Sequence, residues 1–299
     1  MERSIDGIIN LNKPRGRTSF QMVSVVRKLT GFPKAGHAGT LDPDATGVLP
    51  ILLGRATRLV PFLTDSPKVY RAGIEFGRST ATYDSSGDTT AEGDASSLTL
   101  EVIEEALGRF RGTIEQIPPM YSAVKHQGKP LYKLARAGLE VPRQPREVRI
   151  FRLEALEWQK PLLSAEVECS KGTYIRSLAH DLGEVLGCGA CLKQLTRIQT
   201  GPFNINQSIT PEELEKASSE GSWQNLVHPP DTALMHLAAI TVDEEGEENI
   251  KYGRPVFAVG GHEANDGQPG RAYSGDGRFL ALVCFREETG LWHPKRVFG

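Results

Sequence analysis

What this sequence lacks already narrows the kinds of protein that it can encode. None of its apolar runs approaches the ~20 residues that a membrane-spanning helix needs. The stretch from Met1 to Gly7 has no apolar signal-peptide core and leads directly into a strand-like pattern. The sequence also has neither a G-x-G-x-x-G loop nor a Walker loop for a nucleotide cofactor. We therefore expect a cytoplasmic protein that does not associate with membranes.

Cysteine is scarce, and its four positions do not suggest a structural framework. Cys169, Cys188, Cys191 and Cys284 are too few and too clustered for a disulfide scaffold. Cys188 and Cys191 form one C-x-x-C pair, but a zinc site would need two further ligands at a suitable spacing. We predict no metal and no cofactor. Buried or reduced thiols are the favoured interpretation of the pair, and a redox pair is the alternative.

The net charge is also small, at −2, which taken alone argues against a nucleic-acid partner. Its distribution is uneven, because residues 1–152 hold 22 Lys+Arg and 16 Asp+Glu, whereas residues 153–299 hold 13 and 21. Residues 116–152 alone carry eight basic and two acidic side chains. A local basic stretch can bind a phosphate backbone even in a slightly acidic protein. A solvated loop that is basic only for solubility explains the charge equally well.

Helix-like and strand-like patterns alternate irregularly along the chain. A short apolar run predicts a buried strand at 7–12, alternation predicts strands at 68–77 and 165–170, and helical periodicity predicts helices at 19–30, 99–110 and 173–186. Turn residues predict loops at 33–50 and 79–97. This arrangement favours an α+β fold with a mixed, largely antiparallel sheet and flanking helices. After about residue 230 the pattern changes to short strands, which predicts a small C-terminal β domain.

The loop from Gly36 to Gly47 is the most informative stretch for chemistry. Its three glycines let the backbone approach a ligand closely. Asp42 precedes Pro43, which disfavours a helical conformation and holds the carboxylate on a constrained turn. The alternative is an ordinary turn, in which the aspartate bonds only to its own backbone.

A second cluster follows the strand at 165–170. There Arg176 lies in the first turn of a helix, where its charge is poorly matched to the helix dipole. Paired with a buried carboxylate it would orient that acid and lower the pKa of the acid. A plain salt bridge between elements is the alternative. Tyr70, on the inward face of a strand, is either a core residue or a stacking platform for an unpaired base.

These motifs resemble those of the bacterial TruB family of tRNA pseudouridine synthases. The stretch Gly36-His37-x-Gly39-x-Leu41-Asp42-Pro43-x-Ala45-Thr46-Gly47 is similar to the catalytic signature of that family. The likeness extends from about Gly7 to Pro202. Within this range, three more motifs resemble those of the family: Leu11-Asn12-Lys13-Pro14, Val69-Tyr70-Arg71 and Lys171-Gly172-Thr173-Tyr174-Ile175-Arg176. Ala38 departs from the threonine that is frequent there.

The resemblance implies the pseudouridine synthase fold and a cofactor-free isomerase that acts on uridine 55 in the T loop of tRNA. Asp42 would be the catalytic carboxylate that assists cleavage of the glycosidic C–N bond, after which the uracil rotates and rejoins through C5. Whether Asp42 adds to C1′ or a glycal forms stays open. Arg176 would pair with Asp42. Tyr70 would stack on the target uracil and assist the later removal of the C5 proton.

The resemblance gives supporting roles to four further residues. Tyr174 and Leu195 would line the substrate pocket, and His37 would fill the gap that the extruded base leaves in the T loop. Lys13 would support the catalytic loop as a structural residue.

A basic insertion and a C-terminal domain complete the resemblance. The stretch Pro118-x-Met120-Tyr121-Ser122-Ala123 begins a segment at about 116–148 that is similar to the bacterial thumb insertion, which grips the T stem-loop. Lys125, Lys129 and Lys133 would contact RNA phosphates. Because this insertion is typical of bacterial members, it favours a free-standing enzyme over a guide-RNA-dependent one. Residues from about 237 resemble a PUA domain, which touches the tRNA acceptor end.

We therefore predict a catalytic domain at 1–232 and a PUA-like RNA-binding domain at 233–299. The expected partner is tRNA, with no protein partner and a monomeric state. A non-catalytic tRNA-binding or tRNA-folding protein is the main alternative. A glycoside hydrolase is a weaker alternative, because that chemistry usually needs two opposed carboxylates. Only Asp42 stands in a matched motif.

Overall fold

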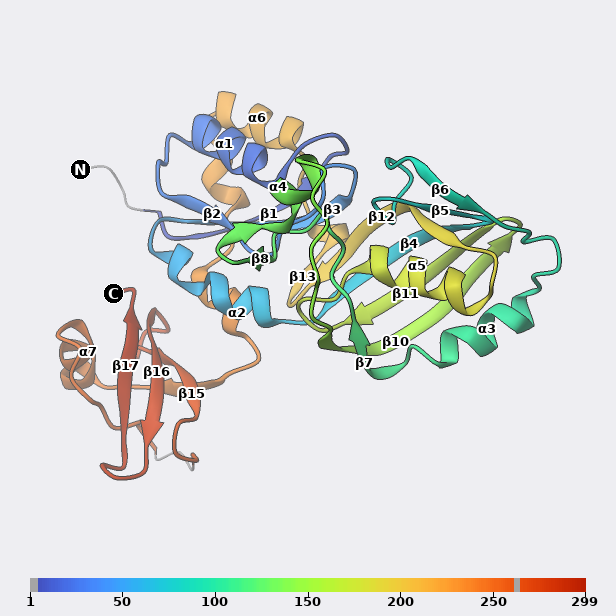
Figure 1. Cartoon of the computed structure of the whole chain (residues 1–299). Helices are drawn as coiled ribbons and strands as arrows, with labels where there is room; N and C mark the ends of the chain where they lie inside the picture. The colour runs from blue at the N-terminus through green and yellow to red at the C-terminus, as the bar shows by residue number, and fades with distance from the viewer. Residues whose placement is uncertain (1–4, 261–263) are drawn as a thin grey trace.

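The computed structural model describes residues 5–260 and 264–299 (Figure 1). Residues 1–4 of the predicted catalytic domain and residues 261–263 of the predicted C-terminal domain lie outside the described residues. Within the described ranges, no helix is both long enough and apolar enough to cross a membrane.

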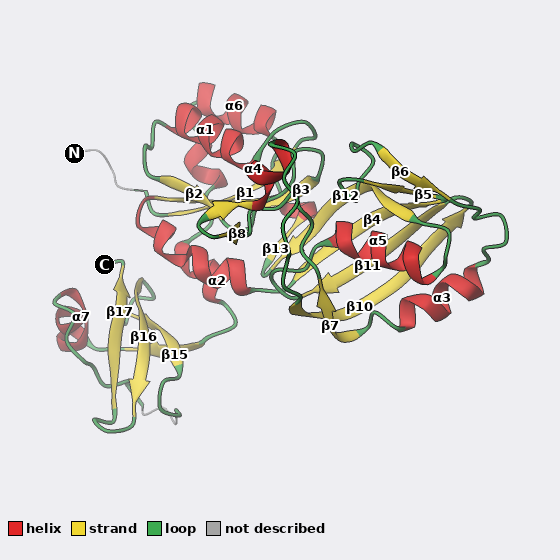
Figure 2. Cartoon of the chain, viewed as in Figure 1, coloured by secondary structure: helices red, strands yellow, loops and turns green. Residues whose placement is uncertain are grey.

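Strands and helices alternate irregularly along the chain, as Figure 2 shows. The strands are β1 (Gly7–Lys13), β2 (Ala35–His37), β3 (Thr46–Leu53), β4 (Lys68–Phe76), β5 (Arg78–Thr80), β6 (Thr89–Glu92), β7 (Gly112–Gln116), β8 (Lys125–His126), β9 (Lys129–Pro130), β10 (Arg146–Gln159), β11 (Leu162–Cys169), β12 (Ala190–Thr200), β13 (Phe203–Asn204), β14 (Ala238–Thr241), β15 (Pro269–Tyr273), β16 (Phe279–Arg286) and β17 (Leu291–Val297). The α-helices are α1 (Ser19–Thr30), α2 (Val60–Asp65), α3 (Leu100–Gly108), α4 (Leu131–Arg136), α5 (Ile175–Val185), α6 (Pro211–Ser219) and α7 (Glu244–Lys251), and short 3-10 turns include η1 (Gly54–Leu59) and η4 (Pro230–Leu234).

The large sheet confirms the predicted fold class. Its strand order is β1-β3-β12-β4-β11-β10-β7, with β2 beside β3 and β13 beside β12. The pairs along it are antiparallel except β12 with β3, which is parallel and brings Arg197 opposite Gly47. The sheet is therefore mixed and largely antiparallel. The single parallel pair places the end of the catalytic loop, where β3 begins, beside the middle of β12.

Local sequence signals explain where the first helix begins and ends. The Thr18 hydroxyl accepts a hydrogen bond from the Gln21 backbone N–H at 3.1 Å, and the Gln21 side chain accepts one from the Thr18 N–H at 2.7 Å. This capping box satisfies amide groups that have no partner within the helix. Gly31, with a φ of 73°, ends the helix in the left-handed conformation.

The core lies between the large sheet and the helices that cover it. In Figure 1, α3 and α5 lie over the strands β4, β11 and β10. The alternation of β4 turns Tyr70, Ala72 and Ile74 into this core and leaves Arg71 exposed. Leu178 and Leu182 of α5 are fully buried in the same cluster. Burial of such side chains contributes about 1.5–3 kcal/mol each, so this packing holds α5 firmly on the sheet.

Two predicted loops contain strands. The segment predicted as a loop at 33–50 includes β2 and the first half of β3, and the segment at 79–97 includes the hairpin β5–β6. Residues 46–53 form a continuous buried apolar strand with no alternation, because both of its faces are covered. Because apolar and polar residues do not alternate in this segment, the sequence pattern does not indicate a strand there.

The predicted C-terminal β domain is confirmed as a separate sheet, ordered β14-β15-β16-β17, with α7 beside it (Figure 1). Its own core includes Ile240, Val256 and Trp292. Leu282 and Phe298 instead join a cluster with residues of the first part of the chain. The domain boundary at 232/233 stays a prediction.

Gly47, in β3, is a position at which the main sheet tolerates no side chain. Its φ is 100°, and a Cβ there would lie 2.2 Å from the backbone oxygen of Arg197. We expect Gly47→Ala to lower the free energy of unfolding by about 3 kcal/mol, because it combines backbone strain with a clash between β3 and β12. Urea denaturation would measure this loss.

Gly36→Ala is the matched control, because a Cβ at Gly36 would meet no atom within 4 Å. Equal stability of the two variants would contradict the close approach of β3 and β12.

Candidate active site

Asp42 lies on the loop that joins β2 to β3, and its backbone is fixed from both sides. The Ser19 hydroxyl accepts a hydrogen bond from the Leu41 N–H at 2.9 Å, and the Asp42 carbonyl accepts one from the Ala45 N–H at 3.1 Å. Leu41 and Ala45 are buried in the main core. The loop is therefore a constrained turn, as predicted, and it is attached to the start of α1.

The Asp42 carboxylate pairs with Arg176. The distance from Arg176 Nε to Asp42 Oδ2 is 2.9 Å, and 45% of the Asp42 side chain is exposed against 7% of the Arg176 side chain. The alternative of an ordinary turn, in which Asp42 bonds only to its own backbone, is therefore wrong. The acid stands at an opening, and the guanidinium lies beneath it.

Every arm of the Arg176 guanidinium has an oxygen partner. Nη1 lies 3.6 Å from Asp84 Oδ2 and donates to the Thr82 carbonyl at 3.4 Å. Nη2 donates to the Tyr121 carbonyl at 2.9 Å. A buried charge persists only where it is paired and hydrogen-bonded in this way. The guanidinium therefore has a fixed orientation toward Asp42.

The pKa of Asp42 lies above its ordinary value. Burial of the carboxyl raises this pKa, the Arg176 guanidinium lowers it, and the neighbouring Asp84 raises it further. Arg176 thus lowers the pKa of Asp42 as expected, but the loss of hydration on burial outweighs this attraction. A perturbed acid at an opening is typical of a functional site.

Lys13 is fully buried under the same loop. Its Nζ donates to the carbonyls of Pro14 at 2.9 Å, Arg17 at 2.6 Å and Pro43 at 2.9 Å. Burial lowers the pKa of Lys13 to about 8, although Asp42 and Asp44 oppose the change. The bond to Pro43 ties the residue next to Asp42 to the end of β1.

Tyr70 is buried opposite Arg197, its register partner on β12. Burial raises the pKa of Tyr70, while a hydrogen bond from Arg197 lowers it and the nearby Asp42 raises it. Arg197 Nε also donates to the Val48 carbonyl at 2.8 Å and Nη2 to the Gly39 carbonyl at 2.9 Å. Arg197 therefore links the catalytic loop, β3 and Tyr70.

An open recess brings together some of the predicted site residues. It is lined by Asp42, Arg176 and Leu195 together with Asp84, Leu192 and Gln194. Tyr70, Tyr174 and His37 do not line it. His37 lies in β2, where burial lowers its pKa and its Nδ1 has no hydrogen-bond partner among the described residues. The recess therefore combines carboxylates and the Arg176 guanidinium with apolar side chains of β12.

Tyr174 is the N-cap residue of α5, and Gln116 anchors it. The Gln116 side chain accepts a hydrogen bond from the Tyr174 N–H at 3.0 Å and donates to its carbonyl at 3.3 Å. Lys125, Lys129 and Lys133 are exposed on the segment from β7 to β10. In Figure 1 this segment extends away from β7 and carries α4.

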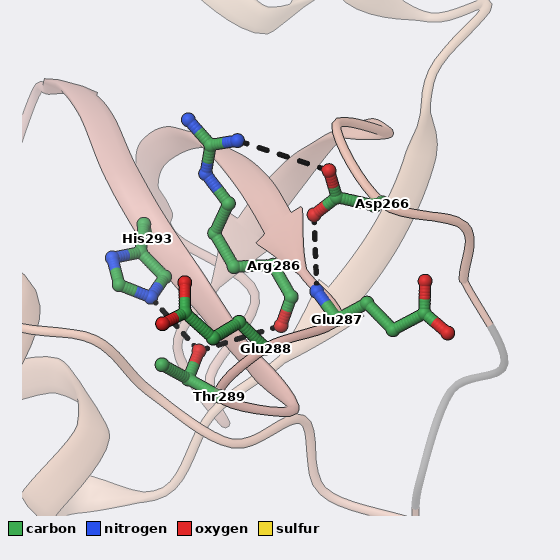
Figure 3. Close-up of a pocket in the computed structure, with 6 residues that line it drawn as sticks. All are labelled: Asp266, Arg286, Glu287, Glu288, Thr289 and His293. Carbon is green, nitrogen blue, oxygen red and sulfur yellow. Dashed lines mark hydrogen bonds and ion pairs between the residues drawn. The ribbon is translucent and has the colours of Figure 1, made fainter.

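A larger hollow lies elsewhere, in the C-terminal domain, and has a different character. Figure 3 shows Asp266, Arg286, Glu287, Glu288, Thr289 and His293 around it. Arg286 lies 3.9 Å from Asp266, which also accepts a bond from the Glu287 N–H at 3.1 Å. The Arg286 and Asp266 side chains are thus paired with each other, as are those of Thr289 and His293. No group of three or more His, Cys, Asp or Glu side chains suited to a metal ion occurs in the described part of the chain.

Three further residues of this site are not predicted from the sequence: Asp84, Arg197 and Gln116. Asp84 stands in a polar stretch predicted to be a surface loop, and only the fold brings it to Arg176. Arg197 lies two residues after Leu195 on the same strand, which could have indicated that it belongs to the site. The sequence does not show, however, whether an arginine is buried or exposed. Gln116 ends β7 without any motif.

Comparison with known proteins gives two family matches that adjoin. Residues 27–175 match the TruB family pseudouridylate synthase (N terminal domain), and residues 176–235 match the tRNA pseudouridylate synthase B C-terminal domain. Asp42 lies in the first match and Arg176 opens the second. The ion pair between them therefore joins the two matched parts.

Relatives with curated names cover almost the whole chain. The tRNA pseudouridine synthase B of Dehalococcoides mccartyi (strain ATCC BAA-2266 / KCTC 15142 / 195) is 46% identical over 297 residues, which is 98% of this chain and 97% of that protein. The protein of the same name from Pseudomonas aeruginosa (strain UCBPP-PA14) is 47% identical over 261 residues, or 86% of each chain.

Solved structures share the fold. A chain in the structure of an H/ACA RNP bound to a substrate RNA containing 2′-deoxyuridine is 26% identical with a TM-score of 0.75, over 98% of this chain and 85% of that one. A chain of a Cbf5-Nop10-Gar1 complex is 27% identical with the same TM-score and the same shares. The expected pseudouridine synthase fold is confirmed.

Lys13 is the residue whose loss should disturb the catalytic loop most directly. Lys13→Met would leave three backbone carbonyls without their shared donor. We expect the free energy of unfolding to fall by about 3 kcal/mol, since a buried polar group without a partner costs about 1–3 kcal/mol. Chemical denaturation would measure it.

Lys28→Met, on the exposed face of α1, is the control and should change stability little. An unfolding midpoint for Lys13→Met equal to that of the control would show that the three bonds contribute nothing.

Proposed function

The chain belongs to the TruB family of pseudouridylate synthases, and we propose that it converts uridine 55 in the T loop of tRNA to pseudouridine. The observation that carries the proposal is the Asp42–Arg176 pair, 2.9 Å apart, at the floor of an open recess. It stands within the loop whose residues match the signature of the family. The reaction is an isomerisation, so it needs no oxidant, reductant or cofactor.

Asp42 acts as the catalytic carboxylate. As the C–N bond between uracil and ribose breaks, the ionised acid either forms a bond to C1′ or takes a proton from the ribose, which leaves a glycal. The released uracil anion turns within the site and its C5 bonds to C1′, which breaks the Asp42–C1′ bond in the first route and is accompanied by return of the proton from Asp42 to the ribose in the second. The proton on C5 is then lost and N1 gains a proton. Positioned acid–base or nucleophilic assistance contributes about 10²- to 10⁴-fold to such a rate.

Arg176 orients Asp42 and favours its ionised form against the effect of burial. Burial raises the pKa of Tyr70, so its hydroxyl stays protonated at neutral pH. The proposal therefore gives Tyr70 a stacking role first, with its hydroxyl oriented by the hydrogen bond from Arg197. Leu195 supplies an apolar wall and Lys13 supports the loop, whereas Tyr174, which does not line the recess, caps the helix that carries Arg176.

The target base must leave its stack before it can reach Asp42, because enzymes that act on a base within folded RNA extrude it. His37 fills the space that the base vacates, and its lowered pKa keeps the ring neutral for stacking. The exposed Lys125, Lys129 and Lys133 hold the phosphates of the T stem-loop. The protein acts as a free-standing cytoplasmic monomer, and residues 233–299 reach toward the acceptor end.

Asp42→Asn tests the chemistry. The amide keeps the size of the side chain but can neither attack nor accept a proton, so we expect tRNA affinity within about twofold of wild type and a loss of turnover of about 10²- to 10⁴-fold. Tritium release from tRNA labelled at C5 of uridine reports the reaction, and filter binding reports the affinity.

Appreciable tritium release by Asp42→Asn would overturn the role of Asp42. Binding of tRNA by the wild type with no release at all would favour a non-catalytic tRNA-binding protein. Free uracil among the products would instead indicate hydrolysis.

Neutralising the three thumb lysines tests the RNA interface. Lys125→Gln, Lys129→Gln and Lys133→Gln together should weaken tRNA binding and flatten its salt dependence, because each lost phosphate contact lowers the slope by about 1. The control is Lys216→Gln on the exposed face of α6, which should leave the slope unchanged. A triple variant with the slope of the wild type would remove the thumb from the interface.

A further inference from the structure

Tyr83 has an unusual backbone conformation immediately before Asp84. Its φ is 62°, which a large side chain rarely adopts. Such strain persists only where the surroundings over-determine it, and it tends to occur at functional sites. The conformation of Tyr83 therefore needs a specific restraint, and the structure supplies one.

The restraint is a stack between the Tyr83 and His180 rings. Their centroids are 3.9 Å apart and the ring planes differ by only 6°. His180 lies on α5 four residues after Arg176, so the two side chains share one face of the helix. The helix that carries the guanidinium thus also carries the ring that holds Tyr83.

The backbone on both sides of the stack is paired with β12. The Leu192 N–H donates to the Tyr83 carbonyl at 3.0 Å, and the Ser85 N–H donates to the Leu192 carbonyl at 2.9 Å. Leu192 is also part of the wall of the recess. Asp84, between these bonds, directs its carboxylate toward Arg176 at 3.6 Å. The backbone of Asp84 is therefore fixed by Tyr83 before it and Ser85 after it, while its Oδ1 accepts hydrogen bonds from the Thr82 hydroxyl at 2.7 Å and the Ser86 N–H at 3.1 Å.

We propose that Tyr83 and His180 are positioning residues, whose stack holds Asp84 against Arg176 and so fixes the direction in which the guanidinium meets Asp42. The inference rests on the proposed function of the Asp42–Arg176 pair. Arg176 has two carboxylate partners at different distances, 2.9 Å and 3.6 Å. If Asp84 moves, Nη1 loses its carboxylate partner and keeps only the Thr82 carbonyl at 3.4 Å, so the guanidinium is less firmly held.

A direct contact of Tyr83 with RNA is the competing role. One face of the ring is already covered by His180, and the side chain is half-buried. The positioning role predicts an effect on turnover, whereas a base-stacking role predicts an effect on tRNA affinity. The two are therefore separable by measurement.

The test compares substitutions at Tyr83 in the full-length protein. Tyr83→Val removes the ring and disfavours a positive φ, so single-turnover tritium release should slow about tenfold, with the Kd for tRNA within about twofold of wild type. Tyr83→Phe keeps the stack and should retain the wild-type rate. Tyr83→Asn tolerates the backbone but loses the ring, and should fall between them.

Combination with Asp84→Asn distinguishes positioning from general loss of structure. If Tyr83 acts through Asp84, then Tyr83→Val should have little further effect on the rate in the Asp84→Asn background. His180→Ala should behave as Tyr83→Val does, and His180→Phe should restore most of the rate. Equal slowing by Tyr83→Val in both backgrounds, or a weakened Kd with an unchanged rate, would overturn the inference.

A crystal structure of Tyr83→Val gives a readout that does not depend on activity. We expect Asp84 to lie beyond ion-pair distance of Arg176, and an unmoved pair would refute the positioning role. Absence of tritium release from the wild type would instead contradict the proposed function, so the two failures are distinguishable.

Discussion

The active site depends on one buried guanidinium. Arg176 loses nearly all contact with water, and a charge in that position is stable only when each of its donors meets an acceptor. Its acceptors come from three separate parts of the chain: Asp42 on the catalytic loop, Asp84 and Thr82 on the β5–β6 segment, and the Tyr121 carbonyl at the base of the thumb. Removing one partner would leave charge uncompensated. The need to satisfy Arg176 therefore holds these segments together around the recess.

The elements that position Arg176 and Asp42 are stiff for independent reasons. The buried stripe of α5 packs on the main sheet, and Gln116 bonds to the residue that caps this helix. The catalytic loop is held from below by Lys13 and from the side by Arg197, both through backbone carbonyls. Polar side chains thus replace the regular backbone pairing that an irregular loop lacks. The result is an exposed acid on a fixed support, which is what positioned catalysis requires.

Burial and charge act against each other at this acid. Loss of hydration and the neighbouring Asp84 raise the pKa of Asp42, and Arg176 opposes both. A carboxyl of this kind gains reactivity from its weak hydration while its partner favours the ionised form. The thumb lysines stand apart from this balance on an exposed segment. In the proposed function, recognition of RNA and chemistry on the base therefore belong to different parts of the molecule.

Local sequence determined several elements of this protein by itself. The capping box at Thr18, the alternation of β4 and the apolar stripe of α5 act over a few residues, and their physics does not depend on the rest of the chain. The resemblance of two separate motifs likewise predicted that Asp42 and Arg176 pair, which the structure shows. Only the tertiary structure decided that β3 is a buried strand, that Arg197 is internal, and that Asp84 faces Arg176. These depend on contacts between residues far apart in the chain, and on a balance of burial against charge that set the direction of the Asp42 pKa.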